Sequence, residues 1–315
     1  MTIGARPLVP SRFAPGGIGQ GARRAATTTL GAYIALTKPR IIELLLITTI
    51  PAMVLAKGGW PSTWLVLTTL IGGTFAAGGA NTINMYVDRD IDRLMPRTRH
   101  RPLVQGLVSP RAALTFAICL EIAAAAVLWS CANLLAAVLA LSGTVIYVFV
   151  YTLWLKRRST RNIVIGGSAG AVPALVGWAA VTGSLAWAPF VLFGVIFFWT
   201  PPHFWALAIR YADDYRAAGV PMLPAVAPAR VAARRMVAYT AVMVATSLLL
   251  PVVGDVGWIY TITAVAAGAL FLVATARLAR GPEPKPAMRV FAYSISYVTL
   301  VFGAVVVDVL VRHGL

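Results

Sequence analysis

Residues 64–92 read WLVLTTLIGGTFAAGGANTINMYVDRDID, an apolar run that ends in three aspartates, Asp88, Asp90 and Asp92. A helix of about 20 apolar residues is long enough to cross the hydrocarbon core of a bilayer. The stretch therefore predicts a membrane-spanning helix that carries a polar site at one boundary of the membrane.

Eight further apolar runs of similar length indicate that the whole chain is built in this way. Because 59% of the 315 residues are hydrophobic and 12% are charged, a single water-soluble core is not expected. The sequence predicts an all-α polytopic membrane bundle of nine transmembrane helices, forming one domain over residues 30–315. The nine runs lie at about residues 35–56, 64–85, 112–130, 132–155, 162–182, 186–209, 237–254, 257–278 and 290–311.

The basic residues are divided unevenly between the two ends of this bundle. Of the 27 Lys and Arg residues, all but Lys57 and Arg312 precede residue 41 or fall in alternate, longer loops. Cytoplasmic loops of membrane proteins carry the excess of Lys and Arg, so we expect the N-terminus and the four large loops in the cytoplasm and the C-terminus outside. The formal net charge of +17 then reflects topology and contact with anionic membrane lipid, and no nucleic acid partner is expected.

Residues 1–29 contain four Arg, no acid and scattered Pro and Gly, which predicts a flexible cytoplasmic N-terminal extension. An Arg-rich start without acids also resembles an organellar transit peptide, but no clear amphipathic helix accompanies it. We therefore favour the bacterial plasma membrane over the mitochondrial inner membrane as the location.

Helical geometry brings Asn84, Asp88 and Asp92 together where the second run ends. Residues four apart lie on nearly the same face of a helix, so these three side chains form a row and Asp90 points elsewhere. The same row continues backwards through the small residues Ala80, Ala76 and Gly72. Small side chains either permit close packing of helices or leave room for a substrate.

A second acidic pair, Asp213 and Asp214, follows the sixth run on the same predicted side. Carboxylates that collect at one boundary repel each other unless a cation joins them, and oxygen ligands without thiols suit Mg²⁺. The candidate metal ligands are Asn84, Asp88, Asp92, Asp213 and Asp214. The alternative is that the first three aspartates are solvated and paired with their neighbours Arg89, Arg93 and Arg97.

Basic side chains stand near both acidic clusters in the sequence. Acids and bases above an apolar cavity suit a diphosphate head on a lipid tail, because metal bridges carboxylates to phosphate while Lys and Arg hold the outer oxygens. The four clustered aspartates Asp88, Asp92, Asp213 and Asp214 are then the candidate catalytic residues. The candidate diphosphate-binding residues are Lys38, Arg40, Asn84, Arg97, Arg101, Lys156 and Arg157, with Arg158 beside them.

The Asn-x₃-Asp-x₃-Asp motif after the second of nine runs, with another acidic motif after the sixth, resembles the UbiA superfamily of intramembrane prenyltransferases. Within it, residues 88–103 and 199–224 resemble the branch that farnesylates protohaem, as do residues 37–40 and 151–157. The run Pro201-Pro202-His203 separates this branch from the quinone prenyltransferases. Asp213-Asp214 departs from the usual Asp-x₃-Asp of the superfamily, which leaves open which of the two contacts metal.

The resemblance implies a helical bundle around a central cavity that is capped by the acidic loops, with Mg²⁺ as cofactor. It implies transfer of the farnesyl group of farnesyl diphosphate to a vinyl group of haem B, giving haem O and diphosphate. It also suggests a downstream haem-modifying enzyme or oxidase assembly factor as a partner. An apolar cavity would keep water from the allylic cation. The rings that could stabilise this cation, or simply pack, are Tyr147, Tyr151, Phe198 and Trp199.

Three ionisable residues inside the runs leave alternatives open. His203, about 10 Å deeper than Arg210 at 1.5 Å per residue, is either a haem contact or a hydrogen-bonded packing residue. Glu121 is expected to form a hydrogen bond between helices, but Glu43 and Glu121 would also suit a transporter of a lipid or metabolite. A prenyltransferase acting on an aromatic quinone precursor is the alternative within the same class.

Overall fold

The computed structural model describes residues 28–314, apart from the side chains of residue 41 and residues 43–46. The predicted extension over residues 1–29 therefore lies almost entirely outside the described residues, and so does the side chain of Glu43. Every regular element in the described part is a helix, as predicted. In chain order these are α2 (Thr29–Thr37), α3 (Pro39–Lys57), α4 (Thr63–Leu94), α5 (Pro110–Cys131), α6 (Leu134–Val145), the π-helix η1 (Ile146–Leu155), α7 (Asn162–Thr182), α8 (Trp187–Arg210), α9 (Ala212–Ala217), α10 (Leu223–Val226), α11 (Ala229–Ser247), α12 (Leu250–Val253), α13 (Trp258–Arg280) and α14 (Pro284–Arg312).

Eight segments of the described chain are long and apolar enough to cross a membrane, and they match eight of the nine predicted runs. They are α4, α5, α6 with η1, α7, α8, α11 with α12, α13 and α14. The apolar helix described within α3 is Ile47–Lys57, which is shorter than a span. The count of nine spans and the orientation in the membrane therefore stay predictions.

The first predicted run is not one continuous helix. Lys38 lies between α2 and α3 with φ 55° and ψ 64°, in the left-handed region that residues other than glycine rarely adopt. Pro39 explains the break, since proline disfavours the α conformation of the residue before it. The expected run 35–56 is thus corrected to a short helix, a turn at Lys38 and a second helix that begins at Pro39.

The row of small residues on α4 serves close packing of helices. A Cβ atom added at Gly72 would lie 2.6 Å from Cγ of Leu128 on α5. Contacts this short leave no space for a larger side chain. Of the two predicted uses of these small residues, the structure supports close packing at Gly72. Gly79, beside the row, packs as closely, since a Cβ atom there would lie 2.5 Å from Oε1 of Glu121 on α5.

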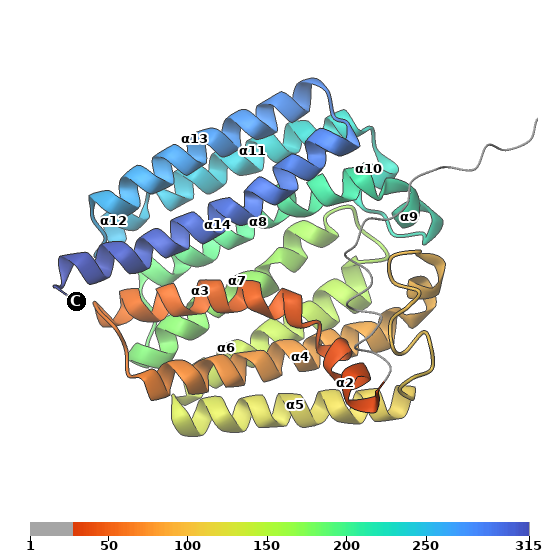
Figure 1. The fold of residues 1–315 in the computed structure, drawn as a ribbon, viewed down its shortest axis with the longest axis horizontal. Helices are drawn as coiled ribbons and strands as arrows, with labels where there is room; N and C mark the ends of the chain where they lie inside the picture. The colour runs from red at the N-terminus through yellow and green to blue at the C-terminus, as the bar shows by residue number, and fades with distance from the viewer. Residues whose placement is uncertain (1–27, 315) are drawn as a thin grey trace, which may run out of the picture.

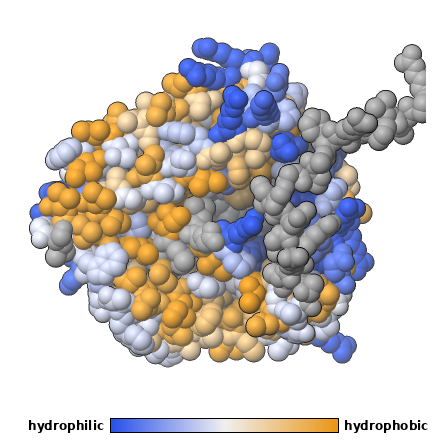
Figure 2. All heavy atoms as spheres, in the orientation of Figure 1, coloured by the Kyte–Doolittle hydropathy of each residue, from blue (hydrophilic) through white to orange (hydrophobic). Residues whose placement is uncertain are grey.

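The long helices run beside one another, and the segments that carry most of the basic residues gather at one end of the bundle. Figure 1 shows α9, α10 and the loop after α4 toward the right, with the C-terminus at the opposite end. In Figure 2, hydrophobic side chains cover much of the middle of this face, and hydrophilic ones gather toward its right and upper edges. Exposed apolar residues such as Ile122, Trp129 and Phe149 suit contact with lipid.

Candidate functional site

The acidic row on α4 is buried in the way that helical periodicity predicts. Asn84 is 2% exposed, Asp88 is 0% exposed and Asp92 is 1% exposed. Asp90 points outward, with 60% of its side chain exposed. The shared face of the first three residues, and the separation of Asp90 from them, are therefore confirmed.

Asn84 is held by three neighbours from three parts of the chain. Lys38 Nζ donates to Asn84 Oδ1 at 2.8 Å. Asn84 Nδ2 donates to Asp88 Oδ2 at 2.8 Å and to Thr152 Oγ1 at 3.0 Å. The break before α3, the end of α4 and the π-helix η1 thus meet at one amide group.

Each buried carboxylate of the row has a cationic partner from outside α4. Lys156 Nζ donates to Asp88 Oδ2, and Arg157 Nη2 lies 3.8 Å from Asp88 Oδ1. Arg101 Nη1 donates to Asp92 Oδ2 at 2.6 Å. Carboxylates this deeply buried are stable only when paired. The alternative that these aspartates are solvated and paired with Arg89, Arg93 and Arg97 is wrong for Asp88 and Asp92, because both are buried and their partners are other residues of the loops that follow α4 and η1.

Each of these carboxylates nevertheless has one oxygen that accepts no hydrogen bond from the described residues. Asp88 Oδ1 and Asp92 Oδ1 are buried, and neither accepts a hydrogen bond from the described part of the chain. A carboxylate oxygen with free lone pairs is the ligand type that Mg²⁺ takes, so these two residues fit the predicted metal. The same described part contains no group of three or more His, Cys, Asp or Glu placed to hold a metal ion. The predicted acidic ligands are therefore not gathered into a metal cluster.

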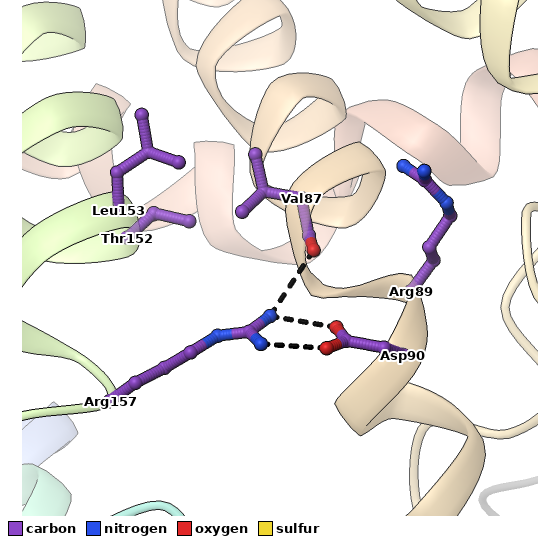
Figure 3. A pocket seen from close by; sticks show the side chains of 6 residues that line it. All are labelled: Val87, Arg89, Asp90, Thr152, Leu153 and Arg157. Atoms are coloured by element: carbon purple, nitrogen blue, oxygen red, sulfur yellow. Dashed lines mark hydrogen bonds and ion pairs between the residues drawn. The ribbon is translucent and has the colours of Figure 1, made fainter.

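Asp90 is one of the residues that line an open pocket of about 450 Å³ between α4 and η1. Arg157 enters this pocket and donates to Asp90 through Nη1 at 2.6 Å and Nη2 at 2.7 Å, and to the Val87 carbonyl at 3.3 Å (Figure 3). The hydrogen-bonded Asp90 carboxylate raises the pKa of the Arg157 guanidinium above its ordinary value. Arg157 therefore stays charged and joins the exposed Asp90 to the buried Asp88.

The second acidic motif is less enclosed than the first. Asp213 is on α9, with a side chain that is 95% exposed, and pairs with Arg216 one turn later. Asp214 is partly buried, and no hydrogen bond or ion pair of its side chain is found among the described residues.

The predicted site residues therefore fall into two groups. Five form one connected network at the end of α4, namely Lys38, Asn84, Asp88, Lys156 and Arg157, and Asp92 with Arg101 forms a separate ion pair one turn further along. The guanidinium of Arg97 lies 5.8 Å from the ring centre of Tyr211, at the end of α8. Arg40 is exposed at the start of α3, and Asp213 and Asp214 lie outside the network.

The expected aromatic and histidine positions divide in the same way. Tyr147 and Tyr151 stack with ring centres 5.5 Å apart, and Lys156 Nζ lies 5.9 Å from the Tyr151 ring centre, so this pair borders the network. His203 lies between Trp199 and Phe291, with ring centres 4.2 Å and 4.4 Å away. His203 also has the hydrogen-bond partner that the packing interpretation requires, because its Nδ1 and the Ser294 hydroxyl are 2.6 Å apart.

Two further results bear on the sequence predictions. Glu121 forms a hydrogen bond between helices as expected, with the Thr144 hydroxyl 3.2 Å from Oε1 and 3.1 Å from Oε2. Thr152 was missed, although it lies in the stretch 151–157 on which the family resemblance rests. Its only signal was a hydroxyl four residues before Lys156, which indicates no role without knowledge of what η1 faces.

Comparison with known proteins gives a consistent result. The model of the UbiA prenyltransferase family matches residues 45–300. The chain is 55% identical over 283 residues to Protoheme IX farnesyltransferase of Parafrankia sp. (strain EAN1pec), covering 89% of this chain and 90% of that protein. It is 56% identical over 282 residues to the protein of the same name from Paenarthrobacter aurescens (strain TC1), covering 88% of each.

Solved structures show the same fold at low sequence identity. A digeranylgeranylglyceryl phosphate synthase aligns with a TM-score of 0.75 at 20% identity, covering 89% of this chain and 98% of that one. A UbiA homologue from Archaeoglobus fulgidus, bound to DMAPP and Mg²⁺, aligns with a TM-score of 0.58 at 18% identity, covering 86% and 99%. Because the family model matches residues 45–300 of this chain and the relatives are 55% and 56% identical, the chain belongs to the UbiA prenyltransferase family.

Proposed function

We propose that this chain transfers the farnesyl group of farnesyl diphosphate to a vinyl group of haem B, giving haem O and diphosphate. The observation that carries the proposal is the buried row of Asn84, Asp88 and Asp92, surrounded by cations at the polar end of an apolar bundle. The name shared by the relatives that are 55% and 56% identical supports farnesyl as the transferred group and protohaem as the acceptor.

The diphosphate would lie among Lys38, Arg101, Lys156 and Arg157, whose charges meet at the acidic row. These cations are held on carboxylate and amide oxygens, so they are already oriented before an anion arrives. As the C–O bond of farnesyl C1 breaks, both bonding electrons leave with diphosphate, and the nearby positive charges stabilise that negative charge. Arg40 and Arg97 are proposed to reach the outer phosphate oxygens from the rim.

The free oxygens Asp88 Oδ1 and Asp92 Oδ1 are proposed to hold Mg²⁺, with Asn84 contributing its amide oxygen. When bound, Mg²⁺ supplies Lewis-acid stabilisation of the phosphate oxygens. Asp213 and Asp214 are proposed to complete the site from α9, Asp214 more directly because it is partly buried and unpaired within the described chain. The homologue solved with DMAPP and Mg²⁺ binds the same classes of ligand.

The farnesyl cation left by loss of diphosphate needs protection from water. The faces of Tyr147 and Tyr151 border the network and are proposed to stabilise the cation. The vinyl carbon of haem then supplies the electron pair of the new C–C bond to farnesyl C1. Water adds only afterwards, to the cation left on the vinyl group, and one of its protons is released to solvent, which gives the hydroxyethylfarnesyl substituent.

His203 is proposed as a contact to haem. Its Nδ1 is engaged by Ser294, and stacking on Trp199 and Phe291 fixes the ring plane. This arrangement leaves Nε2 as the ring nitrogen available for contact with haem. The apolar helices and the bacterial relatives support a place in a bacterial plasma membrane. The uneven distribution of Lys and Arg supports the N-terminus and the acidic site on the cytoplasmic side.

The test is turnover by the purified protein in lipid nanodiscs. With haem B, farnesyl diphosphate and Mg²⁺, we expect release of diphosphate and conversion of haem to a heavier, more apolar product, and no turnover with EDTA. Prenylation of 4-hydroxybenzoate without reaction on haem would contradict the acceptor. Absence of diphosphate release with every acceptor, together with solute flux in vesicles, would favour a transporter.

A further inference from the structure

In the π-helix η1, the Thr152 hydroxyl donates its one proton to the backbone of its own helix. Thr152 Oγ1 donates its proton to the Tyr147 carbonyl at 2.8 Å, five residues earlier, which is the residue spacing of a π turn. A hydroxyl has one proton, so toward any other neighbour this oxygen acts only as an acceptor. The side chain that uses this acceptor is Asn84, whose Nδ2 lies 3.0 Å away.

The partners of Asn84 permit one orientation of its amide. The Lys38 ammonium only donates, so it must face Oδ1, whereas the Asp88 carboxylate only accepts and must face Nδ2. The Thr152 hydroxyl faces Nδ2 as well. A rotation of the amide by 180° would place Oδ1 against two acceptors and Nδ2 against the ammonium, so three contacts would become repulsive.

These three partners differ in what an anionic, metal-bearing substrate would do to them. Lys38 and Asp88 are charged, and a diphosphate and its cation would compete for both groups. Thr152 is neutral, completely buried and bonded to the backbone of its own helix, so a charged substrate would not compete for its hydrogen bond to Asn84. It is the partner of Asn84 that a bound substrate leaves in place.

From these contacts we infer that Thr152 is a positioning residue of the site, and the inference rests on the proposed function. Its hydroxyl holds the Asn84 amide so that Nδ2 faces the protein and Oδ1 faces the side of Lys38, where the substrate would lie. The π-helical segment supplies the carbonyl that takes the hydroxyl proton, and the residue directly after it is Lys156, which bonds Asp88. A single irregular turn would thus organise two residues of the acidic row.

The test measures Mg²⁺-dependent binding of farnesyl diphosphate, by titration calorimetry on protein in nanodiscs, beside kcat and KM. We expect Thr152→Val to weaken binding about tenfold, the effect of one lost hydrogen bond that leaves a buried donor unpaired, and Thr152→Ser to restore it. In an Asn84→Ala background, Thr152→Val should cause no further loss, because the hydroxyl acts through that amide. Thr240→Val is the matched control, since Thr240 is equally buried, bonds only its own helix and should bind as the original chain does.

The outcomes separate this inference from the proposed function. If the unaltered chain shows no Mg²⁺-dependent binding of farnesyl diphosphate, both fail together. If it binds but Thr152→Val binds equally well, or the losses from Asn84→Ala and Thr152→Val add independently, only the role of Thr152 is overturned. Should Thr152→Val not yield folded protein by thermal unfolding, Thr152→Ala carries the same test, since it removes the hydroxyl without adding bulk.

Discussion

Asp308 lies at one end of the bundle, and Asp88 and Asp92 lie at the other. All three carboxylates are buried, but their oxygens differ in how many hydrogen bonds they accept. Asp308, near the C-terminal end of α14, is fully buried and takes backbone N–H groups at the start of α13. Its Oδ2 accepts from Gly257, and its Oδ1 accepts from Ile259 at 3.0 Å and Tyr260 at 3.2 Å. Both oxygens are satisfied, as a helix cap requires.

Asp88 and Asp92 are buried to the same degree, yet each has one oxygen that accepts no hydrogen bond from the described chain. Their other oxygens face cationic side chains, whose remaining N–H groups can also bind an anion, whereas the partners of Asp308 are backbone N–H groups with no further proton to donate. A fully bonded carboxylate stabilises the fold, and a partly bonded one beside cations keeps capacity for a ligand. The comparison predicts loss of activity at one end and loss of stability at the other.

The largest effect is expected at the acidic row. Asp88→Asn and Asp92→Asn should each reduce turnover by about 10³-fold or more, because the loss of one carboxylate weakens binding of metal and diphosphate together. Turnover of haem with farnesyl diphosphate measures this, and thermal unfolding checks the fold. If both variants turned over at nearly the rate of the unaltered chain, the acidic row would not be the functional site.

The second motif should respond less, and unequally. Asp214 is partly buried and without a partner in the described chain, whereas Asp213 is exposed and paired with Arg216 on its own helix. An exposed pair of this kind contributes little stability. We therefore expect Asp214→Asn to lower turnover about 10²-fold and Asp213→Asn about tenfold, because Asp214 would contact the metal directly and Asp213 would lie farther from it. The opposite ranking in kcat would show that Asp213 is the metal contact.

A smaller change is expected at Asp90, which lies off the row. Asp90→Asn removes the bidentate partner of Arg157 but leaves the buried carboxylates in place, so turnover should fall only a few-fold, as for one exposed charge-assisted hydrogen bond. Measurement of KM for farnesyl diphosphate would locate the loss in binding. A fall as large as that of Asp88→Asn would contradict the helical-face argument.

The sequence predicted the parts of this site that depend on local geometry. The periodicity of one helix is enough to separate Asn84, Asp88 and Asp92 from Asp90. The Lys38-Pro39 pair carries a signal for the break before α3, which hydropathy alone does not contain. Helical rows need no knowledge of the rest of the fold.

What could not be predicted depends on which helices meet. Lys156 is 68 residues from Asp88 in the chain, and its contact follows from packing of η1 against α4. The π turn that commits the Thr152 hydroxyl has no reliable sequence signature, since hydrophobic residues fill it as they fill an ordinary span. Asp308 received no role for the same reason, because a cap supplied from another helix leaves no pattern around either partner.

The smallest effect on catalysis is expected at Asp308, where the comparison is most easily broken. Asp308→Ala removes the acceptor of three backbone N–H groups at the start of α13 and should lower stability by about 2 kcal/mol, seen as a fall of several degrees in Tm. Turnover per folded molecule at a temperature well below Tm should not change, since the partners of Asp308 lie at the end of the bundle opposite the acidic row. The matched measurement is Asp88→Asn, whose Tm should change less while its turnover is lost. If Asp308→Ala instead abolished turnover with Tm unchanged, the number of satisfied oxygens would not distinguish a structural carboxylate from a functional one in this bundle, and the free oxygens of Asp88 and Asp92 would lose their meaning as a mark of the site.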